Sequence, residues 1–143
     1  MERKEFLKAC GYACLGGSLF SSLLAGCTEA KLISGDISGA DLVVPISSFL
    51  KKDQTFRPYI VVHNDQLEYP ICLYRFSQTE YAALLMKCPH QGAELQVFGD
   101  RLQCPAHGSE FNNKGIVQNG PADTNLRAFA VTIQNEQVKI SLK

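Results

Sequence analysis

The stretch from Cys88 to Phe111, CPHQGAELQVFGDRLQCPAHGSEF, decides the fold because it contains one short loop twice. Residues 88–95 read CPHQGAEL and residues 104–111 read CPAHGSEF. Each has Cys, Pro, His, Gly, a small residue, Glu and an apolar residue in that order, with one additional residue before the second His. Apolar and polar residues alternate on both sides of a turn at residues 98–101, which predicts a β-hairpin between the loops. Such a hairpin brings four metal-ligating side chains together.

The spacing of these ligands distinguishes between two kinds of metal site. The candidates are Cys88, His90, Cys104 and His107. A tetrahedral zinc ion with two Cys and two His is one possibility, but about two to four residues usually separate paired zinc ligands. Only one residue separates Cys88 from His90, which suits two adjacent irons better, because each loop can send its Cys to one iron and its His to the other.

The frames CPHQG and CPAHGS resemble the Rieske [2Fe–2S] family, in which two His replace two Cys on one iron. The resemblance implies one [2Fe–2S] cluster per chain. It places Cys88 and Cys104 on a buried iron, and His90 and His107 on an iron near solvent. It also implies an all-β fold of stacked antiparallel sheets, with a small cluster-binding subdomain at about residues 86–122.

The resemblance also implies roles for residues around the cluster. The Ser109 hydroxyl is expected to donate a hydrogen bond to a bridging sulfide, and a loop containing Pro121 is expected to cover the cluster. High-potential members have a Tyr at the position of Phe111 and a disulfide between the positions of Ala93 and Ala106. The oxidised cluster with two thiolates is neutral, which favours reduction and raises the potential into the family range of roughly −150 to +300 mV. Phe111 has no hydroxyl, and Ala93 and Ala106 cannot form a disulfide. The sequence therefore predicts an intermediate potential, below that of the high-potential members.

The amino-terminal residues have the features of an export signal. Residues 1–26 combine a basic head with an uncharged stretch rich in Leu, Ala, Gly and Ser. The sequence LAGC ending at Cys27 resembles the bacterial lipoprotein box, which implies lipidation of Cys27; an uncleaved signal anchor is the alternative. The adjacent Arg3 and Lys4 resemble the twin-arginine motif, which implies export of the folded protein. Residues 27–40 are predicted to be a lipidated polar tether.

Residues 41–143 are predicted to form the Rieske domain. Apolar stretches of about five residues recur roughly every ten residues without a helical period, which predicts an all-β fold. Pro45 indicates that the first of these strands, at residues 41–46, lies at a sheet edge, because proline cannot donate to a ladder. Cys72 is interpreted as a small core residue and His63 as a strand residue rather than as ligands.

The expected function is one-electron transfer by a membrane-tethered protein that faces the periplasm. Partners would be cytochromes or oxidoreductase subunits, and we do not expect the chain to be an enzyme by itself. The alternatives are the Rieske subunit of a cytochrome bc-type quinol-oxidising complex or of a periplasmic molybdenum oxidoreductase, and, from another class, a zinc-binding structural lipoprotein. The chain has 14 basic and 14 acidic residues and no charged run, so no nucleic-acid partner is indicated.

Overall fold

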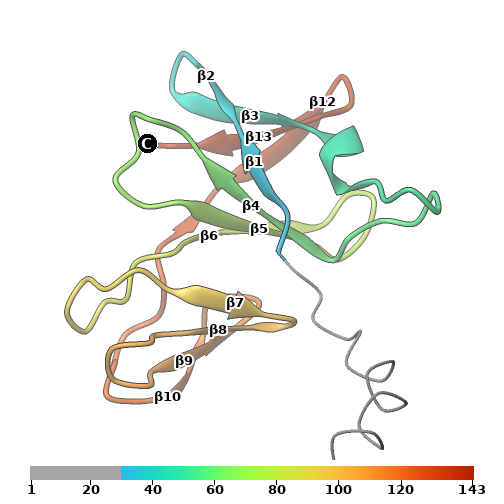
Figure 1. Ribbon diagram of the computed structural model, residues 1–143. Coiled ribbons are helices and arrows are strands. Elements are labelled where there is room, and N and C mark those ends of the chain that lie inside the picture. Colours follow the sequence, from blue (N-terminus) through green and yellow to red (C-terminus); the bar gives the residue numbers. More distant parts are fainter. Residues whose placement is uncertain (1–29) are drawn as a thin grey trace, which may run out of the picture.

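The computed structural model describes residues 30–143, which form three β-sheets (Figure 1). The predicted all-β fold with several antiparallel sheets is confirmed. The central sheet contains, in spatial order, β1 (Leu32–Ser34), β4 (Tyr59–His63), β5 (Ile71–Arg75), β6 (Tyr81–Leu85) and β11 (Ala128–Phe129). The hairpin sheet contains β10 (Val117–Asn119), β9 (Glu110–Asn112), β8 (Arg101–Gln103) and β7 (Gln96–Phe98). The base sheet contains β12 (Val131–Gln134), β13 (Gln137–Ser141), β3 (Asp41–Pro45) and β2 (Asp36–Ser38), and a 3-10 helix, η2 (Ile46–Phe49), follows β3.

The central sheet is buried on both faces. Successive side chains of a strand point to opposite faces. In β5, Cys72 and Tyr74 join the hydrophobic core under the hairpin sheet, whereas Ile71 and Leu73 join the core against the base sheet. This double burial explains why β4 and β5 read as continuous apolar stretches rather than as alternating ones.

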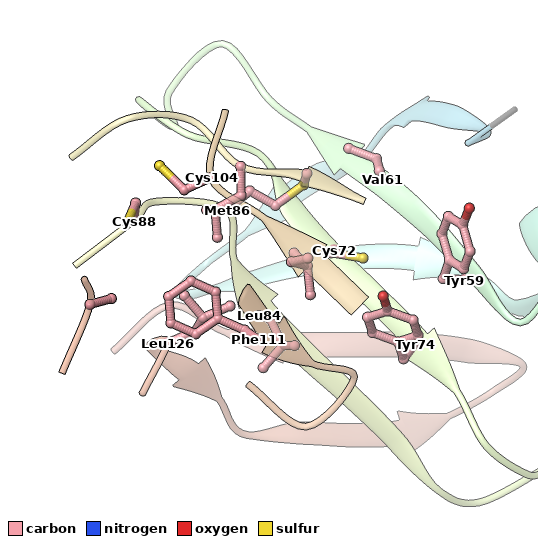
Figure 2. Packing of buried hydrophobic residues seen from close by; sticks show 13 residues of the cluster. Tyr59, Val61, Cys72, Tyr74, Leu84, Met86, Cys88, Cys104, Phe111 and Leu126 are labelled. Carbon is pink, nitrogen blue, oxygen red and sulfur yellow. The ribbon is translucent and has the colours of Figure 1, made fainter. Parts of the chain in front are cut away.

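The core between the central and hairpin sheets supports the repeated loops. Figure 2 shows Cys88 and Cys104 at one side of this cluster, with Tyr59 and Tyr74 at the opposite side. Phe111 of β9 is fully buried in the same cluster and lies opposite Leu102 of β8. The two Cys/His loops are therefore supported by packed core residues.

The prediction of a polar tether over residues 27–40 is wrong for residues 32–38. β1 pairs in parallel with β4, and β2 pairs with β3. A Cβ atom added to Gly35, between the two strands, would lie 2.8 Å from Val62 Cγ1. Gly35 therefore permits close packing where the sequence suggested a flexible linker.

The first domain strand is not at a sheet edge, so this prediction is also wrong. β3 lies between β13 and β2 in the base sheet. β2 faces only residues 41–43 of β3, and Pro45, the last residue of β3, lies beyond that pairing. No residue of β2 needs an N–H donor at the position of Pro45, so an interior strand can contain this proline.

The predicted signal at residues 1–26 and the lipidation site at Cys27 lie outside the described residues. Within residues 30–143, the structure contains no helix long and apolar enough to span a bilayer.

Candidate metal centre

The two Cys/His loops have the same backbone hydrogen bonds. In the first loop the Cys88 N–H donates to Ala93 O (2.8 Å) and the Gly92 N–H donates to Cys88 O (2.8 Å). In the second loop the Cys104 N–H donates to the carbonyl oxygen of residue 109 (2.8 Å), and the N–H of residue 108 donates to Cys104 O (3.0 Å). Each loop has its Gly at positive φ, 77° at residue 92 and 81° at residue 108, where a side chain would be strained. The sequence repeat is thus a structural repeat.

The four predicted ligand residues lie together, with their sulfurs and imidazoles at different depths. Cys88 and Cys104 are 1% and 2% exposed, whereas His90 and His107 are exposed. The two imidazole ring centroids are 4.9 Å apart, and the rings are nearly perpendicular at 88°. The loops therefore place a buried thiol pair beneath an exposed imidazole pair.

Backbone N–H groups lie close to both sulfurs. Burial raises the pKa of the Cys88 thiol, as does the neighbouring Cys104 thiol, although the His90 N–H and the Ser109 hydroxyl act in the opposite direction. Burial alone would also raise the pKa of Cys104. The N–H groups of Ala106 and His107, together with the Cys88 thiol, outweigh burial and lower this pKa. The same donors would stabilise sulfur atoms that carry negative charge.

Ser109 contacts the loop that contains Pro121, the other residue expected beside the cluster. Ser109 is fully buried, and its Oγ accepts the Ala122 N–H at 3.0 Å. Pro121 is exposed and Ala122 is buried, so the loop turns its backbone toward the site. Since the Ser109 oxygen already accepts a hydrogen bond, its hydrogen is free to point toward a sulfur.

Tyr69 supports the first loop and was missed by the sequence analysis. Its hydroxyl donates to Gly92 O at 2.7 Å, and the Lys87 Nζ lies 5.0 Å from its ring centroid. Tyr69 is 23 residues from Gly92 and lies between β4 and β5, so no local pattern connects it with the loop. A contact of this range is visible only in the folded chain.

The arrangement suits a cluster of two irons. Each iron of a Rieske cluster takes only two protein ligands, and bridging sulfides supply the others. Two buried thiols with N–H donors and two exposed imidazoles could supply these two pairs.

The chain is similar to parts of several known proteins. It is 41% identical over 75 residues to the oxygenase component of dicamba O-demethylase from Stenotrophomonas maltophilia, a match that covers 46% of this chain and 22% of that protein. It is 26% identical over 128 residues to iron-sulfur subunit 1 of the cytochrome b6-f complex from Synechocystis, which covers 88% of this chain and 62% of that protein. The chain thus spans about a fifth of the first relative and less than two thirds of the second.

Solved structures show the same fold. A chain in the complex of reduced oxygenase and oxidized ferredoxin in carbazole 1,9a-dioxygenase superposes with a TM-score of 0.55 at 23% identity, covering 74% of this chain and 96% of that chain. The plasma membrane Rieske protein of the cyanobacterium Synechocystis gives a TM-score of 0.52 at 20% identity, covering 59% and 87%.

The family model described as "Rieske [2Fe-2S] domain" matches residues 42–130, which include both Cys/His loops and all four strands of the hairpin sheet. The cofactor of that family is a [2Fe–2S] cluster, and its proteins act in electron transfer. The chain belongs to the Rieske [2Fe–2S] domain family.

Proposed function

We propose that Cys88 and Cys104 hold the buried iron, that His90 and His107 hold the exposed iron, and that the chain carries single electrons between redox proteins. The observation that carries the proposal is the buried thiol pair beneath an exposed imidazole pair whose ring centroids are 4.9 Å apart. When bound, the cluster supplies a one-electron centre. The exposed imidazoles give a partner protein a short path to that centre, and the buried sulfurs are shielded from water.

We further propose that the protein is exported and tethered to a membrane on its periplasmic side. The support comes from the sequence: a basic head, an uncharged stretch and Cys27 after small residues. The basic pair Arg3-Lys4 suits export after cluster insertion in the cytosol. The mass of the mature amino terminus tests this part, because a diacylated Cys27 and an uncleaved anchor differ in both length and added lipid.

Metal analysis of the purified full chain tests the cluster. We expect two irons and two acid-labile sulfides per chain, visible absorption and an EPR signal on reduction. The variant Cys104→Ser should lose this absorption. The matched control Cys72→Ala alters another buried cysteine, one in the core, and should keep it. One zinc per chain in a colourless protein would instead establish the zinc-binding alternative and refute the electron-carrier function.

A second candidate function is that of a Rieske subunit in a quinol-oxidising cytochrome complex. It is favoured by the similarity to the cytochrome b6-f iron-sulfur subunit, which extends over 88% of this chain. A quinone analogue that shifts the EPR signal of the membrane-bound protein would support this role. The same signal without a shift, together with reduction by a soluble redox protein, would support the free carrier.

A further inference from the structure

We propose that one end of the domain rests on the membrane surface and that the imidazoles point away from the lipid. This end, the aromatic end, presents the exposed side chains of Phe76 and Phe98; the buried Tyr59 and Tyr74 pack behind them, with Ala30 beside Tyr59. The proposal rests on the lipid tether of the proposed function and adds the surface of the domain that touches the bilayer.

The tether is too short to let the domain move far from the membrane. Ala30 already packs against the core beneath the hairpin sheet, and the Val61 N–H donates to Lys31 O at 2.9 Å. Only two residues separate the proposed lipidation site, Cys27, from Ala30. Since a chain extends at most roughly 3.6 Å per residue, the lipidated residue lies within about 11 Å of Ala30.

The tether enters the central sheet at the start of β4. β1 runs parallel to β4, with Leu32 opposite Val61. Following this register back by two residues places Ala30 level with Tyr59, the first residue of β4. The lipid attachment must therefore lie near that end of the sheet.

Aromatic contacts connect this end of the sheet with the tip of the β7–β8 hairpin. The Tyr59 and Tyr74 ring centroids are 5.4 Å apart, and the Tyr74 and Phe76 centroids are 6.3 Å apart with stacked planes. The Tyr74 hydroxyl donates to Gly99 O at 3.0 Å, and Gly99 follows Phe98 at the hairpin tip. In Figure 1 the chain likewise enters β1 on the side of the domain where this hairpin turns.

The exposed side chains of the aromatic end suit a lipid–water interface. Phe98 is 52% exposed and Phe76 is 36% exposed, and the Lys114 Nζ lies 5.7 Å from the Phe76 ring centroid. Aromatic rings beside cationic side chains are typical of proteins that lie in the interface. The exposed Asp100 and Arg101 near the tip carry opposite charges, so we expect apolar contact and the tether, rather than net charge, to hold this end.

The Cys/His loops extend from the opposite end of the central sheet. Tyr74 pairs with Ala82 near the aromatic end, whereas Ile71 pairs with Leu85, three residues along β6. Those three residues span roughly 10 Å of strand, and Cys88 lies beyond Leu85. The imidazoles then face the aqueous phase, where they can meet a redox protein, and they stand away from quinol dissolved in the bilayer.

Tryptophan fluorescence can test this orientation, because the sequence contains no tryptophan. The variant Phe98→Trp places one emitter at the aromatic end. The matched control Gln66→Trp places one in the exposed β4–β5 loop, where Tyr69 binds Gly92 of the first Cys/His loop. Each lipidated, cluster-loaded variant is bound to phosphatidylcholine vesicles with and without brominated acyl chains. Taking the ratio of the two intensities cancels quenching by the cluster.

We expect Phe98→Trp to lose about half of its emission in brominated vesicles, because interfacial side chains lie roughly 5–10 Å into the headgroup boundary. Gln66→Trp should be unchanged. If the chain does not float with vesicles, the tether is wrong and the orientation fails with it. If it floats and both variants are quenched equally, the orientation is wrong although the tether stands. Phe76→Trp repeats the test at the same end should Phe98→Trp not load its cluster.

Discussion

The variant Ser109→Ala tests whether the buried hydroxyl contacts both a sulfur of the bound cluster and the loop that contains Pro121. Ser109 is fully buried, accepts the Ala122 N–H at 3.0 Å, and lowers the pKa of the Cys88 thiol. The substitution removes one acceptor from a buried N–H and one donor from the neighbourhood of a sulfur. Stability and redox potential should therefore both change, for separate reasons.

The two effects have different magnitudes. A buried N–H without an acceptor costs about 1–3 kcal/mol, and a loss of ~2 kcal/mol in a domain of this size lowers Tm by roughly 6–12 °C. A hydroxyl that donates to a sulfur of the bound cluster would stabilise the reduced state, which is more negative, more than the oxidised one. If that difference is about 1 kcal/mol, the midpoint potential falls by roughly 40 mV, since a tenfold change for one electron corresponds to 59 mV.

Thermal unfolding followed by circular dichroism and a redox titration followed by EPR measure these two changes on the full chain. The control Ser38→Ala removes an exposed hydroxyl from β2 and should alter neither. A fully loaded Ser109→Ala protein with the parental midpoint would refute hydrogen bonding between the hydroxyl and a sulfur. An unchanged Tm would refute a stabilising contact with Ala122.

Three further predictions concern the surroundings of the site and the core. Phe111→Tyr should raise the midpoint potential by tens of millivolts if the new hydroxyl reaches a sulfur; lower stability with the parental potential would contradict this. Gly115→Ala should destabilise the protein by about 2–4 kcal/mol in denaturant titrations, because φ is positive and the new Cβ would lie 2.9 Å from Leu84 Cδ2. The control Gly39→Ala, at a residue with positive φ and open space around it, should lose only about 1–2 kcal/mol. Equal losses in the two variants would rule out the contact with Leu84. Burial raises the pKa of the Cys72 thiol. Above pH ~8.5 the unfolded chain therefore loses a proton that the folded chain keeps, and the free energy of unfolding should fall by up to about 1.4 kcal/mol per pH unit. Cys72→Ala should remove that dependence between pH ~8.5 and ~10, and a slope retained in the variant would assign it to another group.

The sequence predicted the parts of the fold whose signals are local. The repeated Cys/His loops and the hairpin between them could be predicted because spacing and turn residues determine them. β4 and β5 could be recognised because burial on both faces makes them continuously apolar. These same features bring the four candidate ligands together, so the sequence identified the candidate residues more completely than the residues that support them.

The parts that were missed depend on contacts between distant segments. β1 and β2 have three residues each and polar neighbours, so their composition is that of a linker. Their structure comes from pairing with β4 and β3. The predicted edge position of β3 was wrong for the same reason, because β2 was not recognised as its partner. Tyr69 was missed because its hydrogen bond to Gly92 crosses 23 residues.

The short strand β1 shortens the linker between Cys27 and the folded domain, which its polar composition does not suggest. A tether of fourteen residues, as the sequence suggested, would let the domain turn and bring the imidazoles to lipid-bound or water-soluble partners alike. With β1 paired to β4 and Ala30 packed in the core, two residues remain between Cys27 and the folded domain. If Cys27 carries the proposed lipid, chain length limits the orientation of the domain, and the end of the central sheet at which the chain enters decides which redox partners the imidazoles can reach.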